Sequence, residues 1–134
     1  MNRAALLLIC LPVLAQAQTP ALKLGAWETT SKSAMFPRPM VDNDCVKKAD
    51  LEQFSKGPDK DEESCKPAKA PTVIGNKWTT DQTCADGRTV HAEFVAESPE
   101  RVTGTIVSKS PKGGSAIRID VSARWLGPSC KGLE

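Results

Sequence analysis

Strict alternation of apolar and polar side chains over residues 116–125 constrains the fold of this chain more than any other feature. The apolar set ends at a tryptophan and consists of Ile117, Ile119, Val121, Ala123 and Trp125. The intervening set is mostly polar and consists of Ala116, Arg118, Asp120, Ser122 and Arg124. Because successive side chains of a β-strand point to opposite faces, this pattern predicts a strand with one face in the core and the other in water.

Four further segments have strand character and predict an antiparallel meander. Residues 89–96 and 101–108 alternate more weakly, while residues 25–35 and 77–84 are rich in Thr and Ser around a tryptophan. The connections carry turn residues: Gly75-Asn76, Asp86-Gly87, Ser98-Pro99 and Pro111-Lys112-Gly113-Gly114. The fold class predicted is all-β, a mostly antiparallel curved sheet or partial barrel of about six or seven strands.

One short helix is predicted after residue 49. Asp50 is the candidate N-cap, with Gln53 three residues later as in a capping box. Leu51 and Phe54 would share one face, and Gly57 would end the helix.

The N-terminus has the features of a secretory signal peptide. Arg3 precedes an apolar run over residues 4–15, and Ala15-Gln16-Ala17 forms a small-residue cleavage site. The run contains Pro12 and is shorter than the roughly 20 residues that span a bilayer, so we expect no membrane span in the mature chain. We expect residues 1–17, with Cys10, to be removed, leaving residues 18–134 as one β-rich domain in the periplasm, or secreted as the alternative.

The charge of the mature chain excludes a strongly electrostatic role. Loss of Arg3 from the 18 basic and 16 acidic residues leaves 17 against 16, a net charge near +1. Nucleic-acid binding rests on excess positive charge, so no nucleic-acid partner is expected.

Four cysteines remain after cleavage, which predicts two disulfides in an oxidising compartment. A hairpin turning at Ile74/Gly75 would pair residues whose numbers sum to 149, as 65 and 84 do. Cys65 is therefore predicted to bond Cys84, which leaves Cys45 for Cys130. Pro67 would confine the first strand of that hairpin to a sheet edge.

The register of the next hairpin stays open between two readings. A two-residue turn at Asp86-Gly87 would set Cys84 opposite Thr89, whereas the apolar face of residues 89–96 is the even-numbered one. Either a longer, bulged loop shifts the register, or the core face of residues 77–84 is the odd one.

The order of short motifs resembles DUF3617, a family of bacterial exported proteins of unknown function. The residues that carry the resemblance are Leu24-Gly25-Ala26-Trp27-Glu28-Thr29-Thr30, Asp44-Cys45, Ser64-Cys65-Lys66, Trp78-Thr79-Thr80, Thr83-Cys84, Leu126-Gly127 and Cys130-Lys131. The chain lacks the Met- and Gly-rich loops common in the family, although residues 35–40 are similar to a remnant of one. The resemblance implies an envelope location and a disulfide-stapled β-fold, and it supplies no function.

No catalytic, metal or cofactor motif is present in the sequence. His91 is the only histidine and is predicted to lie on the polar face of its strand beside Glu93, with no nucleophile nominated. The acidic residues Asp42, Asp44 and those of 59–63 lack the spacing of a calcium loop and predict a solvated surface. We therefore expect no catalytic residues, no metal and no cofactor.

Three tryptophans on separate predicted strands are the candidate binding residues: Trp27, Trp78 and Trp125. They either pack the core or line a cleft on the concave face of a curved sheet. The leading hypothesis is a non-enzymatic module that binds a small molecule or an envelope protein. The alternatives are an enzyme without a recognisable motif and an inhibitor or structural partner that acts through the Met35 to Met40 loop.

Overall fold

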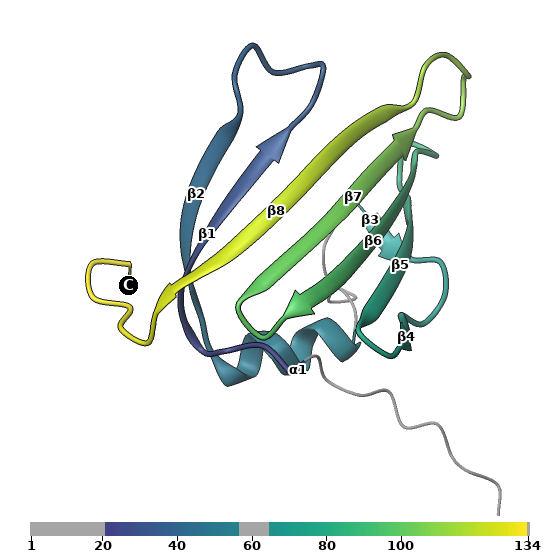
Figure 1. Ribbon diagram of the computed structural model, residues 1–134. Helices are drawn as coiled ribbons and strands as arrows, with labels where there is room; N and C mark the ends of the chain where they lie inside the picture. The colour runs from purple at the N-terminus through teal and green to yellow at the C-terminus, as the bar shows by residue number, and fades with distance from the viewer. Residues whose placement is uncertain (1–20, 57–64, 134) are drawn as a thin grey trace, which may run out of the picture.

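The computed structural model describes residues 21–56 and 65–133. The predicted signal segment over residues 1–17 and the predicted helix end at Gly57 lie outside the described residues. Figure 1 shows one strongly curved antiparallel sheet, with a single helix packed on one side of it.

The elements follow one another in the order β1 (Gly25–Lys32), β2 (Met40–Val46), α1 (Lys48–Lys56), β3 (Cys65–Pro67), β4 (Thr72–Ile74), β5 (Lys77–Cys84), β6 (Thr89–Ser98), β7 (Arg101–Lys109) and β8 (Ile117–Gly127). The strands lie in the order β2-β1-β8-β7-β6-β5-β3, and β4 also pairs with β5. The sheet does not close into a barrel. The predicted all-β class, with one short helix and two disulfides, is confirmed.

Strands β5 to β8 form the predicted meander. The first and last strands, β1 and β8, pair with each other. Trp27 lies opposite Trp125 across the β1–β8 pair, 98 residues later in the chain. Strand β2, which the sequence analysis did not predict, pairs with β1 and forms one edge of the sheet.

In the hairpin that leads into β5, the two cysteines have the predicted register, but the residues near the turn do not. Cys65 lies opposite Cys84, with a residue sum of 149, but Ile74 lies opposite Lys77, with a sum of 151. The turn is therefore Gly75-Asn76 rather than Ile74/Gly75. Four residues (68–71) between β3 and β4 face two (80–81) on β5 and take up the difference. Pro67 is at the sheet edge, as predicted.

The β5–β6 connection is the longer loop of the two alternatives. The Cys84 amide donates to the Arg88 carbonyl (2.8 Å), and the Gly87 amide donates to the Cys84 carbonyl (2.9 Å). The loop is therefore three residues long, and Gly87 takes the positive φ (84°) that such loops need. Thr83 lies opposite Thr89, so the even-numbered residues of β5 and β6 share the core face.

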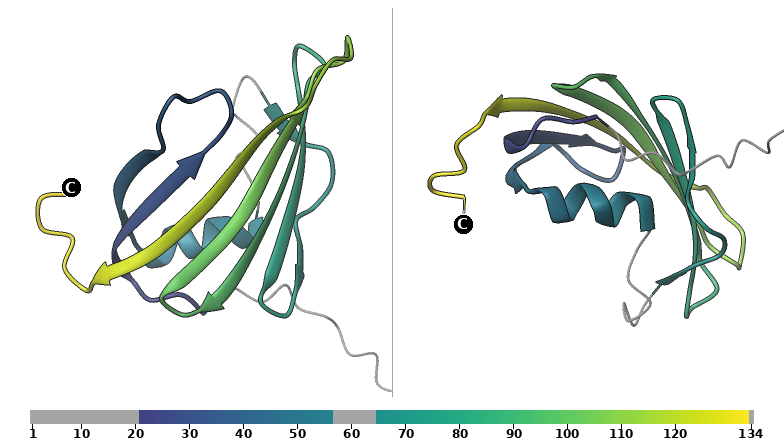
Figure 2. Two further views of the ribbon diagram at one scale, coloured as in Figure 1. Left: turned by 45° about the horizontal axis from the view of Figure 1, so that its top comes forward. Right: turned by 90° about the horizontal axis from the view of Figure 1, so that it is seen from below.

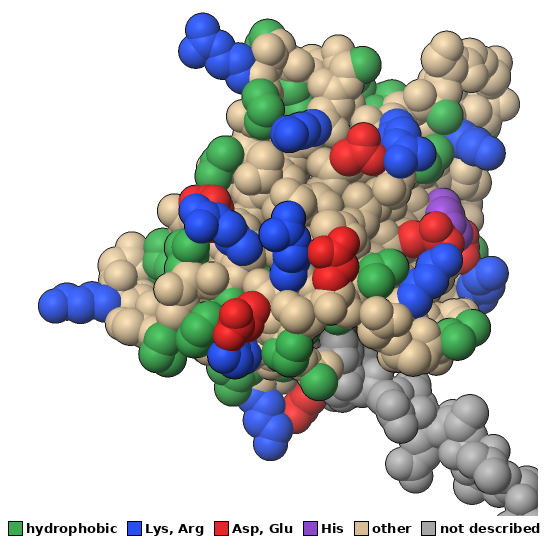
Figure 3. All heavy atoms as spheres, in the orientation of Figure 1, with side chains coloured by type: hydrophobic (Ala, Val, Ile, Leu, Met, Phe, Trp, Pro, Cys, Tyr) green, Lys and Arg blue, Asp and Glu red, His purple; other side chains and the backbone are tan. Residues whose placement is uncertain are grey.

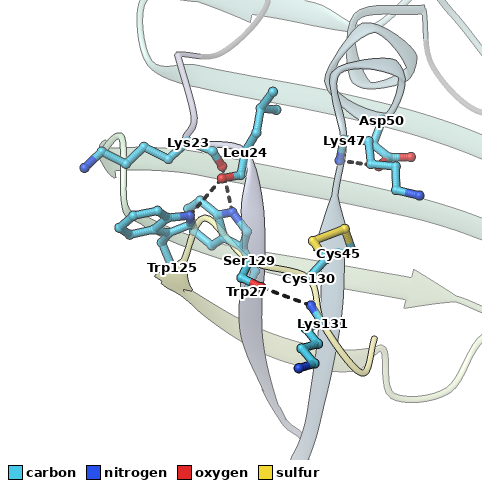
Figure 4. Close-up of a disulfide and its surroundings, with 10 residues drawn as sticks. All are labelled: Lys23, Leu24, Trp27, Cys45, Lys47, Asp50, Trp125, Ser129, Cys130 and Lys131. Carbon is cyan, nitrogen blue, oxygen red and sulfur yellow. Dashed lines mark hydrogen bonds between the residues drawn. A yellow bond between two sulfur atoms is a disulfide. The ribbon is translucent and has the colours of Figure 1, made fainter. Parts of the chain in front are cut away.

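Both predicted disulfides are present: Cys45–Cys130 and Cys65–Cys84. The first joins β2 to the segment that follows β8 (Figure 4). The second lies between β3 and β5.

Helix α1 begins at Lys48, two residues before the predicted start, so Asp50 as the N-cap was wrong. Lys47 is the N-cap, because its carbonyl accepts a hydrogen bond from the Asp50 amide (3.1 Å). The Asp50 carboxylate reaches back to the Lys47 amide (2.7 Å). An acidic residue in the first turn does this in a capping box, and its charge also favours the helix N-terminus.

The two faces of the sheet differ in chemistry. The concave face, on which α1 lies in Figure 2, carries the core cluster of Trp27, Trp78 and Val102. The opposite face mixes acidic and basic side chains (Figure 3), including the pairs Arg124–Glu28 (2.8 Å) and Lys77–Glu93 (2.9 Å). This division follows the alternation read from the sequence.

Candidate functional site

A hollow of about 540 Å³ lies between α1 and the concave face of the sheet. Most of its wall is apolar. Its lining residues are Leu22, Trp27, Thr29, Ser31, Asp44, Cys45, Val46, Asp50, Trp78, Phe94, Val102, Ile106, Val121 and Ala123. Six strands, α1 and the segment before β1 thus contribute to one concave site.

Aromatic side chains from neighbouring strands form part of its floor. Trp78 on β5 lies opposite Phe94 on β6, and their rings stack with centroids 5.7 Å apart and planes 25° apart. Trp27 and Trp78 are each only 3 % exposed. These rings therefore form a rigid, apolar part of the floor, of which only a small area is open to a ligand.

Gly104 on β7 makes room for the Phe94 ring. It lies directly opposite Phe94, and a Cβ atom placed on it would meet Phe94 Cδ1 at 2.2 Å and the Glu93 carbonyl oxygen at 2.6 Å. The ring therefore lies over a position that has no side chain, a pairing of glycine and aromatic residue that recurs in β-sheets.

The segment before β1 fixes two tryptophan rings (Figure 4). Trp27 Nε1 donates to the Lys23 carbonyl (2.8 Å), and Trp125 Nε1 donates to the Leu24 carbonyl (3.1 Å). The Lys23 ammonium lies 4.6 Å from the centre of the Trp125 ring. Gly25 permits this corner, because it has φ 129° and its Cβ position lies 2.2 Å from the Gly127 carbonyl oxygen.

Of the three tryptophans singled out in the sequence, the structure brings Trp27 and Trp78 into the hollow. Trp125 lies beside Trp27 but is outside the lining set. Both of the sequence-based alternatives therefore apply to Trp27 and Trp78, which belong to the core cluster and also face the hollow.

Two aspartates lie in the lining and were not recognised as site residues in the sequence. Asp44, on β2, lies opposite Trp27 and on the same face, and Asp50 is in the first turn of α1. Both are exposed to solvent, and both lie where β2 gives way to α1. From the sequence, Asp44 is assigned to solvated surface because the acidic residues lack the spacing of a calcium loop.

His91 lies on the charged face, away from this hollow. Its Nδ1 atom is 2.6 Å from Asp81 Oδ1, and its Nε2 atom is 3.8 Å from Glu93 Oε1. The hydrogen bond with His91 lowers the pKa of the Asp81 carboxyl, and the ion pair of Asp81 with Lys69 (3.2 Å) acts in the same direction. The Lys77 ammonium lowers the pKa of Glu93. Within the described chain, His91 thus has polar contacts with two carboxylates, and no Ser, Thr or Cys side chain is paired with it as a nucleophile.

The β1–β2 connection presents apolar side chains to solvent. Met35 is 62 % exposed and Met40 is 48 % exposed, with Val41 exposed beside them. The loop is held at its start by the Phe36 amide, which donates to the Ser33 carbonyl (3.1 Å).

Across residues 21–56 and 65–133, no group of three or more metal-ligating side chains comes together. The same residues include no helix long and apolar enough to cross a membrane.

The protein is thus an open, curved β-sheet protein with two disulfides and an apolar concave site. Residues 22–130 match the model of the family described as protein of unknown function (DUF3617), and the chain belongs to this family. The resemblance read from the sequence is thereby confirmed. No curated protein and no solved structure matches the chain.

The structure explains the Gly-x-Trp-Glu segment on which that resemblance rested. Gly25 allows the close approach to Gly127, Trp27 fills the core and lines the hollow, and Glu28 pairs with Arg124 on the opposite face. These three residues of β1 thus contact the last strand, the core and the outer face of the sheet, respectively.

Proposed function

We propose that this protein is an exported, non-enzymatic binding module that holds a small, mainly apolar molecule in the hollow between α1 and the sheet. The observation that carries the proposal is the volume of about 540 Å³ walled by Trp27, Trp78 and Phe94 together with aliphatic side chains. Pockets for small molecules measure about 300–1,000 Å³ and combine an apolar lining with a few polar groups.

The gap between α1 and the sheet supports a binding role over simple core packing. Leu51 of α1 is buried, but the described chain leaves space between the helix and the strands beneath it. The hollow is open to solvent, and its volume lies in the range of small-molecule pockets.

Export is supported by two independent features. The N-terminal sequence has the three regions of a signal peptide, and the chain carries two disulfides, which persist in oxidising compartments. We place the protein in the periplasm on this basis.

Native mass spectrometry of the unreduced protein purified from the periplasm tests export and binding together. We expect the mass of residues 18–134 less four hydrogens, and a reproducible bound molecule. Retention of residues 1–17 would contradict cleavage, and retention together with absence from the periplasmic fraction would contradict export.

A pair of variants on β8 tests the hollow itself. Val121→Phe places a ring in the hollow, whereas Ser122→Phe places the same ring on the opposite face of the same strand. We expect Val121→Phe to weaken binding of a neutral probe, 1-decanol, at least tenfold, and Ser122→Phe to leave it unchanged. Equal affinity for the probe in both variants would refute the assignment of the site.

The exposed Met35 to Met40 loop favours a second candidate, a protein partner in the envelope. The loop protrudes between β1 and β2 (Figure 1), and Met35 and Met40 in it are exposed. Such a role predicts a stoichiometric complex that survives gel filtration and is lost in Met35→Ser, while binding of 1-decanol is unaffected.

A further inference from the structure

The charged side chains in the described wall of the hollow are both acidic. Asp44 and Asp50 are its charged lining residues within the described chain, and no Lys or Arg side chain joins them in the wall. In the same part of the chain, neither carboxylate forms an ion pair with a basic side chain. A ligand therefore meets an apolar wall with two carboxylates that have no basic side chain beside them, although Asp50 also accepts a hydrogen bond from the Lys47 amide.

The position of the two carboxylates sets where a charged group of a ligand would lie. Both are exposed, whereas Trp27 and Trp78 deeper in the hollow are buried. Burying an unpaired charge is costly, so a charged group stays at the mouth while the apolar body enters. The Thr29 and Ser31 side chains line the same part of the wall and supply hydroxyl groups for hydrogen bonds.

The mixed-charge surface elsewhere contrasts with this corner. On the opposite face, Glu28, Glu93 and Asp120 are each paired with a basic side chain. Their charges are locally balanced and do not select a ligand by sign. The hollow is thus the apolar concavity with net negative charge in the part of the chain that the structure describes.

We propose that the ligand is an organic cation with an apolar body, an amphiphilic amine or ammonium compound whose positive group pairs with Asp44 and Asp50. This inference rests on the proposed function and names the ligand class of the same site.

Three probes with one chain and different head groups test the class: decylammonium, 1-decanol and decanoate. Binding to the disulfide-bonded protein is followed by tryptophan fluorescence, below the concentration at which each probe forms micelles. We expect decylammonium to bind at least threefold more tightly than 1-decanol, and decanoate to bind more weakly than 1-decanol. Raising the salt concentration should weaken decylammonium binding alone, because exposed charge pairs are screened.

Asp44→Asn removes one charge from the rim at constant size and should weaken decylammonium binding about two- to fivefold, the range of an exposed ion pair. The fold-loss should be smaller for 1-decanol, which carries no charge, than for decylammonium. Asp50→Asn is a second variant that keeps an oxygen for the Lys47 amide and should act in the same direction. Asp86→Asn, in the β5–β6 loop, is the control for net charge, because Asp86 accepts a hydrogen bond from the Arg88 amide that Asn can also accept.

The outcomes separate this inference from the proposed function. If the three probes bind with equal affinity and Val121→Phe weakens all of them, the hollow binds small molecules but the cationic class is wrong. If Asp86→Asn weakens decylammonium as much as Asp44→Asn does, the effect comes from net charge and the inference is also overturned. If none of the probes binds, the apolar site fails, and with it both the proposed function and the ligand class.

Discussion

Replacement of Gly104 by alanine is the sharpest test of the packing that shapes the hollow. The added Cβ would lie 2.2 Å from Phe94 Cδ1 and 2.6 Å from the Glu93 carbonyl oxygen. The ring can turn away only by leaving its stack with Trp78, and the carbonyl belongs to a paired strand. The contact with the carbonyl is relieved only by a shift of β6 against β7.

The expected cost is that of an overpacked site, about 2 kcal/mol within the usual range of about 1–3 kcal/mol. For a domain of this length, that cost lowers the melting temperature by roughly 8 °C. Circular dichroism of the disulfide-bonded protein measures it: the far-ultraviolet signal follows unfolding, and the near-ultraviolet signal reports the displaced Trp78–Phe94 stack.

A double-mutant cycle with Phe94→Ala isolates the ring contact. Because the cycle removes Cδ1, Gly104→Ala should cost about 1 kcal/mol less in that background than in the wild type. An unhindered Gly→Ala substitution stabilises a protein by about 0.4–1 kcal/mol. If Gly104→Ala proved as stable as the wild type or more stable, the close approach of β6 and β7 would be refuted.

The other predictions concern the disulfides and one carboxylate. The disulfides have sequence separations of 85 and 19, for which loss of chain entropy in the unfolded state gives a stabilisation of about 4.6 kcal/mol for Cys45–Cys130 and about 3.2 kcal/mol for Cys65–Cys84. Replacement of the first pair by alanine should therefore lower the free energy of unfolding in urea more than replacement of the second. The reverse order would show that loop closure is not the main contribution. The pKa of Asp81 is lower in the folded protein than in the unfolded chain, so its carboxylate stabilises the fold above about pH 4 and the stabilisation is lost as the pH falls below that value. Asp81→Asn should therefore lower the free energy of unfolding at pH 7 by less than about 1 kcal/mol, and the difference from the wild type should shrink as the pH falls below about 4; a difference that grew on acidification would contradict the sign of the linkage.

The strands with two-faced alternation, or with Thr and Ser around a tryptophan, could be predicted from the sequence, whereas β2 could not. Strand β8 satisfies the pattern because one side faces the hollow and the other faces water. Strand β2 has an exposed edge position and reads Met-Val-Asp-Asn-Asp-Cys-Val, and its three central residues, Asp42, Asn43 and Asp44, are of types that are depleted in strands. Pairing with β1, a long-range contact, makes it a strand.

The hollow itself was only partly predictable for the same reason. Alternation placed Phe94, Val102 and Val121 on apolar faces, and simple arithmetic gave the Cys65–Cys84 register. The site also needs α1 to lie across the sheet and β2 to place Asp44 beside Trp27. Neither arrangement is encoded within a few neighbouring residues, so the acidic corner was missed.

The pairing of β1 with β8 has a consequence for the order in which this chain can mature. A chain that emerges N-terminus first exposes β1 and Cys45 long before β8 and Cys130 appear. Meanwhile Cys65 and Cys84 are also available, so attack of a thiolate of this chain on a mixed disulfide with an oxidising thiol enzyme could join Cys45 to either of them. The correct bridge can form only when nearly the entire chain has emerged, so we expect enzymes that reshuffle disulfides to speed its maturation.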